Sequence, residues 1–186
     1  MRKILILVFV FGLSLGVAQA QFGVRAGFNS ANFSDTNFDA KSGFHFGAYY
    51  TAEGTFVSVE PGMFFSKKGY QGEELGTGRM VDENLSYLDI PVLLRLNILP
   101  SVNVFAGPQA SLLLAREYQL GDDISNSTDV IRGYDLGGVV GAQVRLPFGV
   151  NVQANFDFGL SSLNYFNTPV KNQVFKLSLG YTLGGN

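Results

Sequence analysis

The stretch "YLDIPVLLRLN", residues 87–97, alternates two kinds of side chain along what reads as one extended strand. Asp89 and Arg95 fall on one face, and the other face is apolar: Leu88, Ile90, Val92, Leu94 and Leu96. In a soluble sheet the apolar face would pack on a core and the charged face would meet water. A membrane barrel reverses the two faces, so the rest of the chain must decide between them.

The first twenty residues have the pattern of a secretory signal peptide. Arg2 and Lys3 precede an apolar run over residues 4–17, and Ala18-Gln19-Ala20 offers small residues for signal peptidase. The apolar run is too short for a comfortable membrane span. We therefore expect a signal peptide over residues 1–20 and one mature domain over residues 21–186. Because the chain has no cysteine, a lipoprotein anchor and thiol chemistry are excluded.

The mature part is acidic, since it contains all 15 Asp and Glu residues while Arg2 and Lys3 belong to the 13 Lys and Arg residues. A nucleic-acid partner is therefore not expected. No segment after residue 20 offers about 18 consecutive apolar residues, which excludes membrane helices. Any membrane role must come from strands.

Alternating runs between turn signals predict eight strands, at 22–33, 43–52, 55–66, 85–97, 102–115, 133–146, 149–161 and 172–183. Short connections at 53–54, 99–101 and 147–149 alternate with long polar ones at 34–42, 67–84, 116–132 and 162–171. Outer-membrane barrels have this asymmetry, with tight periplasmic turns and long outer loops. The expected fold class is all-β: an eight-stranded antiparallel up-and-down transmembrane β-barrel.

The positions of the glycines indicate which face of the wall lies inside the barrel. Eight glycines share the face of the charged residues: Gly27, Gly47, Gly62, Gly107, Gly137, Gly141, Gly159 and Gly180. A water-facing surface has no need of missing side-chain volume, whereas the interior of an eight-stranded barrel is only just wide enough for its side chains. We therefore expect the charged face inside and the apolar face in lipid. The alternative is a soluble lipocalin-like ligand-binding barrel, whose apolar face lies inside.

Hairpin geometry and proline give details that a structure can check. Parity across the turns at 53–54 and 147–149 predicts five pairs of neighbours: Gly47 with Glu60, His45 with Gly62, Arg145 with Asn151, Gln143 with Gln153, and Gly141 with Asn155. Pro61, Pro91 and Pro108 lie inside predicted strands and cannot donate a ladder hydrogen bond. Bulges or local bends are expected there.

The enclosed face has balanced charge: Arg25, Arg95, Arg145 and Lys176 against Glu60, Asp89, Asp135 and Asp157. Because an unpaired buried ion costs several kcal/mol, this balance suits an interior filled with ion pairs. The alternative is a narrow, gated ion path with its three arginines near the periplasmic end. The only histidine, His45, is expected to be a satisfied core residue or a partner of Glu60. No base and nucleophile are brought together, so no catalytic site is expected.

The long loops are mostly acidic, with a few bases: Asp35, Asp39, Glu73, Glu74, Asp82, Glu83, Glu117, Asp122, Asp123 and Asp129, with Lys67, Lys68, Arg79 and Arg132. "GDDISNSTD", residues 121–129, offers Asp122, Asp123 and Asp129 as oxygen ligands for calcium. It lacks the spacing and the terminal Glu of an EF-hand, so a solvated acidic loop is expected. No metal or cofactor is predicted.

Five stretches resemble the PorT-type outer-membrane β-barrel family of Bacteroidetes: "FGVRAGFNSANFS" (22–34), "YLDIPVLLRLN" (87–97), "VFAGPQASLLL" (104–114), "YDLGGVVGAQVRL" (134–146) and "NQVFKLSLGYTL" (172–183). The resemblance covers nearly the whole mature chain. It implies an eight-stranded barrel in the cell outer membrane without assigned catalytic residues, and some relatives take part in protein secretion. One departure is that Leu183 is followed by Gly184-Gly185-Asn186 rather than a terminal aromatic residue, a place that Tyr181 could fill.

The expected function is that of a monomeric, non-enzymatic outer-membrane protein with a structural, surface-interaction or secretion-accessory role. Its expected partners are outer-membrane lipid and lipopolysaccharide, the barrel-assembly machinery during insertion, and a surface or secretion-system protein. The rivals are a narrow ion or small-solute channel and the soluble lipocalin-like barrel.

Overall fold

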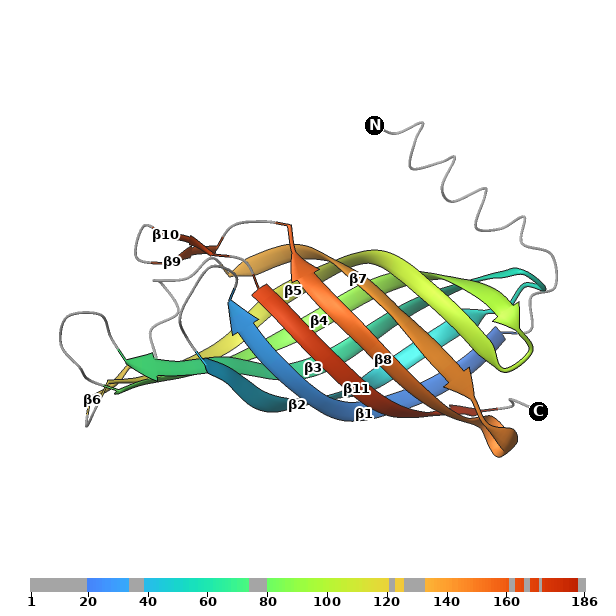
Figure 1. The fold of residues 1–186 in the computed structure, drawn as a ribbon, viewed down its shortest axis with the longest axis horizontal. Coiled ribbons are helices and arrows are strands. Elements are labelled where there is room, and N and C mark those ends of the chain that lie inside the picture. Colours follow the sequence, from blue (N-terminus) through green and yellow to red (C-terminus); the bar gives the residue numbers. More distant parts are fainter. Residues whose placement is uncertain are drawn as a thin grey trace.

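The computed structural model describes residues 20–33, 39–73, 80–120, 123–125, 133–160, 163–165, 168–170 and 172–183. Within them, eight long strands form a closed barrel (Figure 1): β1 (Ala20–Phe33), β2 (Asp39–Ala52), β3 (Val57–Glu73), β4 (Met80–Leu99), β5 (Val102–Leu120), β7 (Tyr134–Arg145), β8 (Val150–Gly159) and β11 (Asn172–Leu183). All pairings are antiparallel, and the β1–β11 pair closes the cylinder. The predicted fold class is confirmed. The predicted signal peptide falls almost wholly on residues outside the described ranges and stays a prediction.

The two ends of the barrel differ. β6 (Asp123–Ser125) and the small pair of β9 (Leu163–Tyr165) and β10 (Thr168–Val170) lie at one end, and the 3-10 turn η1 (Pro147–Gly149) lies at the other (Figure 1). The short-turn end, where β1 begins and β11 finishes, is the periplasmic end in barrels of this class. Over the described residues, no helix is long and apolar enough to cross a bilayer.

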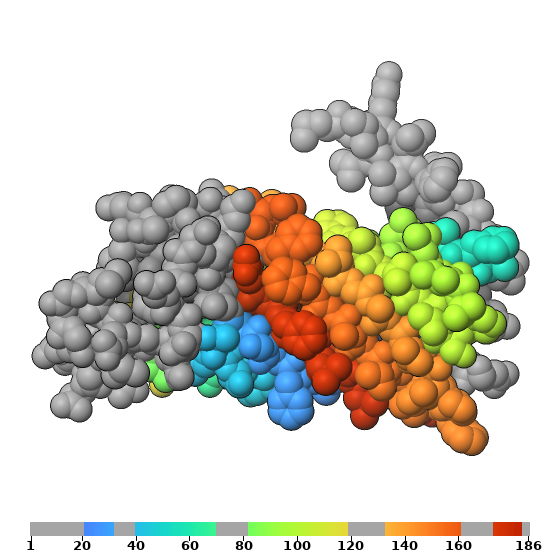
Figure 2. All heavy atoms as spheres, viewed as in Figure 1, coloured from blue at the N-terminus to red at the C-terminus, as the bar shows by residue number. Residues whose placement is uncertain are grey.

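The two faces of the wall are oriented as predicted. Leu94 and Leu179 are 51% and 60% exposed on the outside, whereas Asp89 and Arg95 are 0% and 1% exposed inside. Figure 2 shows the outer side chains of β1, β11, β8 and β7 forming oblique bands across one wall. An aqueous protein would not leave so many large apolar side chains exposed, so the soluble lipocalin-like alternative does not fit.

The predicted register is correct for one of the two hairpins and wrong for the other. Arg145 pairs with Asn151 and Gly141 with Asn155 across the turn after β7. The predicted pairs of Gly47 with Glu60 and His45 with Gly62 are wrong, because Gly47 faces Phe64 and His45 faces Ser66.

The cause of the shifted register is a longer turn between β2 and β3, which covers residues 53–56 rather than a two-residue hairpin. Asn97 on β4 holds this turn: its side-chain Nδ2 donates to the carbonyl of Gly54 at 3.1 Å, and its backbone N–H donates to that of Phe56 at 2.9 Å. The longer turn leaves Phe56 77% exposed at the membrane edge.

No register shift occurs at Pro61, Pro91 or Pro108, so the bulges expected there are absent. Pairing instead lapses locally beside each proline and resumes in the same register, which absorbs the missing donor. Register shifts occur elsewhere in β4–β5, where Leu114 and Ile98 are left without a partner, and between Ala40 and His45 in β2.

Strands β3, β4 and β5 are longer than predicted. They continue to Glu73, from Met80 and to Leu120, so parts of the expected loops 67–84 and 116–132 are strand. The sequence prediction ended each strand where its apolar alternation ended, but a ladder needs no apolar face once the strand has left the bilayer. We call this continuation, residues 67–73, 80–86 and 115–120, the outer sheet.

Candidate functional site

The barrel interior contains eleven charged or histidine side chains that are buried: Arg25, His45, Glu60, Lys68, Glu83, Asp89, Arg95, Arg116, Asp135, Asp157 and Lys176. These include every predicted lumen residue except Arg145. Lys68 and Glu83 were expected in outer loops, and that expectation is wrong. Lys68 lies an even number of residues from Glu60 on its strand, and Glu83 an even number from Asp89, so the alternation could have predicted that both face the lumen. Arg116 is out of phase with Gln109 and Ser111 because of the bulge at Leu114, so parity could not have placed it.

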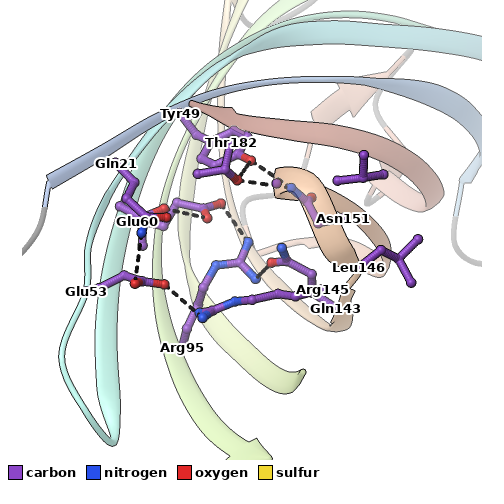
Figure 3. Close-up of a pocket in the computed structure, with 13 residues that line it drawn as sticks. Gln21, Tyr49, Glu53, Glu60, Arg95, Gln143, Arg145, Leu146, Asn151 and Thr182 are labelled. Atoms are coloured by element: carbon purple, nitrogen blue, oxygen red, sulfur yellow. Dashed lines mark hydrogen bonds and ion pairs between the residues drawn. The ribbon is translucent and has the colours of Figure 1, made fainter. Parts of the chain in front are cut away.

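Glu60 is the centre of the layer nearest the periplasmic end (Figure 3). One oxygen, Oε1, accepts hydrogen bonds from Arg25 at 3.0 Å and Arg95 at 2.6 Å, and Oε2 accepts one from Thr51 at 3.2 Å. Arg95 also donates to three amide oxygens, from Asn103 at 2.8 Å, Gln153 at 2.7 Å and Gln143. Strands β1, β3 and β4 are thus joined through one carboxylate.

Arg145 lies at the mouth of the barrel rather than in its dry interior. Its side chain is 33% exposed and pairs with Glu53 at 2.8 Å. Between this rim pair and Glu60 lies a cavity of about 80 Å³, which we call the vestibule. Figure 3 shows its polar lining, which includes Gln21, Gln143 and Asn151.

A second layer crosses the middle of the barrel around Asp89. This fully buried carboxylate accepts hydrogen bonds from Lys68 at 2.8 Å, Lys176 at 2.9 Å and Ser111 at 2.6 Å. Lys176 bridges onward to Asp157 at 2.7 Å. Asp135 is buried close by, on the wall of a cavity of about 10 Å³ that Lys68 and Asp157 also line.

His45 contacts Asn29 and Ser178 rather than Glu60. The Asn29 amide nitrogen donates to the carbonyls of Phe44 at 3.1 Å and Lys67 at 3.0 Å, which leaves its oxygen to accept from His45 Nδ1. His45 Nε2 is then the acceptor for the Ser178 hydroxyl at 2.8 Å.

This Ser178–His45–Asn29 order is that of a hydrolase triad. However, the adjoining cavity holds only about 30 Å³, the space of one water. The site has no room for a substrate, and His45 is a satisfied core residue.

The third layer lies toward the outer end and consists of one ion pair, in which Arg116 Nε donates to Glu83 Oε1 and both side chains are buried. Ion pairs thus block the lumen at three levels. Cavities of about 30 and 10 Å³ lie among these layers, and the vestibule of about 80 Å³ lies on the periplasmic side of Glu60. In the described residues the lumen is a packed interior rather than a passage.

The predicted calcium ligands are not tested. Asp122 and Asp129 lie outside the described residues, and the side chain of Asp123, at the start of β6, is also outside them. Across the described ranges, no three His, Asp or Glu side chains are grouped to hold a metal ion.

Comparison with known proteins agrees with this architecture. The family model described as "Outer membrane protein beta-barrel domain" matches residues 17–165. The chain therefore belongs to that family and is an outer-membrane β-barrel protein. No significant match was found among curated proteins.

Several solved structures are similar in fold. Neisserial surface protein A is 15% identical with a TM-score of 0.58, covering 87% of this chain and 97% of its own. Ail, the attachment invasion locus protein of Yersinia pestis, is 14% identical with a TM-score of 0.56, covering 88% and 99%. OprG from Pseudomonas aeruginosa is 13% identical with a TM-score of 0.51, covering 92% and 99%. At such identities the likeness shows the fold alone.

Proposed function

We propose that this protein is a non-enzymatic, non-conducting barrel that holds the outer sheet at the cell surface, where the sheet binds an extended segment of another protein. The observation that carries the proposal is the continuation of β3, β4 and β5 beyond the apolar band of the wall.

The outward-facing residues of β3 and β4 change from apolar to polar at the same height on both strands. Among the side chains that the structure describes, Phe65 and Leu88 are the last large apolar ones facing outward on β3 and β4, and Lys67 and Ser86 follow them as direct cross-strand partners. A membrane strand needs about 9–11 residues. β4 has 20 residues, so roughly half of it is available outside the bilayer.

The outer sheet has a hollow beside β5. The hollow has a volume of about 410 Å³ and is lined by Lys67, Ser86 and Leu114 among others. Along β5 it lies between Leu112, where the pairing with β7 ends, and Tyr118, where the pairing with β6 begins. A peptide that lies along a strand places alternate side chains in such a hollow, which is the recognition mode that we propose.

Further parts of the proposal rest on the sequence. We propose that residues 1–20 direct export and are removed, that Tyr181 replaces the terminal aromatic signal for the assembly machinery, and that the mature protein is a monomer in contact with lipopolysaccharide. The resemblance to PorT-type barrels supports a secretion-system protein as the partner.

The test uses the absence of cysteine in the native chain. Single variants Ser86→Cys and Ala115→Cys carry a photo-crosslinker in intact cells, and Leu94→Cys on the lipid-facing wall is the matched control. The proposal expects one discrete protein adduct from the outer-sheet positions and none from Leu94→Cys. Adducts only with lipopolysaccharide would replace the protein partner with a lipid one, and no adduct would contradict the proposal.

The rival channel is tested separately in planar bilayers. Three buried ion-pair layers favour a wild-type barrel without discrete openings. Openings that disappear on Arg95→Ala or Glu60→Ala would favour the channel instead.

A further inference from the structure

The outer wall of the barrel has an apolar groove near its periplasmic end. The groove has a volume of about 650 Å³ and lies over β2, β1, β11 and the start of β8. Three of these strands, β1, β11 and β8, form part of the wall that Figure 2 shows. Val24, Phe46, Leu179 and Tyr181 are among the residues that line the groove, and their side chains face outward. The groove is therefore separate from the ion-pair layers of the lumen.

Small side chains between large ones give the groove its shape. Ala26 on β1 is the direct partner of Phe46 on β2 and of Leu179 on β11, and both of these large side chains are exposed. One step closer to the periplasm, Ala48 on β2 is the partner of Val24 on β1. The gap over the two alanines thus runs diagonally across β1 and β2 toward the periplasmic end.

Hydrocarbon is the material that fills a hollow in this wall. The chain belongs to an outer-membrane barrel family, and the bilayer core has no water to occupy an apolar space. Because lipid tails are as apolar as the wall, close packing rather than the hydrophobic effect decides how strongly a tail is held. A tail in the groove contacts protein atoms below and on both sides, whereas a tail on a convex part of the wall contacts them on one side. The groove therefore holds a tail more strongly than its surroundings do.

A second copy of the barrel fits the groove less well than a lipid tail. Phe28 is the next outward residue of β1 beyond Ala26 and is 76% exposed. The rigid wall of a partner barrel would meet Phe28 and Leu179 before it reached the alanine between them. A single flexible chain passes between these side chains, so it is the occupant that the shape favours.

Two tyrosines mark the level of the lipid headgroup. Tyr181 is the partner of Val24 and lines the groove, and Tyr50 is the next outward residue of β2 after Ala48. Tyrosine favours the membrane–water interface, where its ring meets the lipid tails and its hydroxyl meets the headgroups. The groove thus opens at the periplasmic interface. In an outer membrane the periplasmic leaflet consists of phospholipid, whereas lipopolysaccharide occupies the opposite leaflet.

We propose that this groove is a binding site for one acyl chain of a phospholipid from the periplasmic leaflet, and that this phospholipid stays bound when the barrel is extracted. The acyl chain lies over Ala26 and Ala48, and the headgroup lies beside Tyr50 and Tyr181. The site does not depend on the outer sheet, which is at the opposite end of the barrel.

The first experiment counts bound lipids by native mass spectrometry of the whole barrel, extracted from outer membranes in a mild detergent. We expect one phospholipid for each wild-type barrel and none for Ala26→Phe, because the phenyl ring fills the gap. Ala106→Phe is the matched control and should keep the phospholipid. Ala106 lies on β5, opposite β1 in the closed strand order, and has apolar partners on both sides, Leu94 and Val140.

Other results would contradict the site. If Ala26→Phe does not fold, Ala48→Leu fills the other half of the gap and should give the same loss. Equal retention in the groove variant and the wild type, or a wild-type barrel without bound lipid, would overturn the proposal. Lipopolysaccharide in place of phospholipid would also overturn it, as would a wild-type dimer that dissociates on Ala26→Phe.

The second experiment locates the acyl chain. Crystals of the barrel are grown with a phospholipid whose acyl chains are brominated, and anomalous scattering shows the bromine atoms. The proposal expects a peak within van der Waals contact of Ala26 or Leu179. Peaks elsewhere on the wall without one in the groove, or no peak at all, would refute it.

Discussion

Asp89→Asn is the substitution for which the structure gives the clearest expected magnitude. The carboxylate of Asp89 is fully buried and accepts from two ammonium groups, Lys68 at 2.8 Å and Lys176 at 2.9 Å. The amide keeps the shape but removes the charge, so Lys68 loses its only ion-pair partner in the described residues. Removing one partner of a buried ion pair costs about 3–5 kcal/mol. This corresponds to a fall of roughly 100- to 4,000-fold in the ratio of folded to unfolded protein.

A second substitution separates charge from packing. Lys68→Met in the Asp89→Asn background removes the unpaired ammonium and leaves Lys176 with Asp157 at 2.7 Å. The double variant should therefore recover most of the lost stability, since an apolar replacement of a buried ion pair is often close to neutral.

The assay is urea unfolding of the barrel in detergent micelles, with the folded fraction read from gel mobility without heating. The chain has no tryptophan, so this readout replaces tryptophan fluorescence. With a slope of about 2 kcal/mol per molar urea, the single variant should unfold roughly 2 M earlier than the wild type. A single variant as stable as the wild type, or a double variant no better than the single one, would refute the reasoning.

Three further predictions concern packing, hydrogen bonding and the position of the membrane boundary. Gly107→Ala should cost about 1–3 kcal/mol in the same assay, because its Cβ would lie 2.0 Å from the Val92 carbonyl oxygen, while Gly133→Ala meets nothing within 4 Å and should be neutral. Asn29→Ala should destabilise the barrel more than Ser178→Ala. The Asn29 side chain makes hydrogen bonds to His45, Ser66 and two backbone carbonyls, whereas Ser178 makes one hydrogen bond of about 1 kcal/mol. An equal loss of unfolding free energy in the two variants would be inconsistent with these contacts. A membrane-impermeant maleimide should label Ser86→Cys but not Leu94→Cys in intact cells, and the reverse result would misplace the membrane boundary.

The orientation of the wall could be predicted from sequence because it depends on a period of two. Every predicted apolar position of "YLDIPVLLRLN" faces outward, and Asp89 and Arg95 face inward, since one register error would have moved them all together. The same argument places Glu60, Asp157 and Lys176 in the lumen. The alternation of apolar and polar residues along single strands was therefore enough to predict which side chains face the lumen and which face the lipid.

What failed depended on contacts between distant strands. The β2–β3 register shifted because Asn97, on the following strand, holds a longer turn. Arg116, at the start of an expected loop, faces the lumen because of the bulge at Leu114, which no local pattern reveals. The partners of His45 also come from β1 and β11, far away in sequence. Such contacts form only when the barrel closes, so the inward and outward alternation along single strands cannot predict them.

The position of Lys176 bears on how the barrel can be assembled. Lys176 lies on β11, which closes the cylinder against β1, yet its ammonium neutralises Asp89 on β4 and Asp157 on β8. Until β11 is seated, Asp157 has no cation in the described residues, and an unclosed intermediate exposes a surplus of negative charge to the bilayer. Closure of the β1–β11 pair and neutralisation of the buried carboxylates thus occur together. This coupling raises the free energy of an unclosed barrel and favours closure.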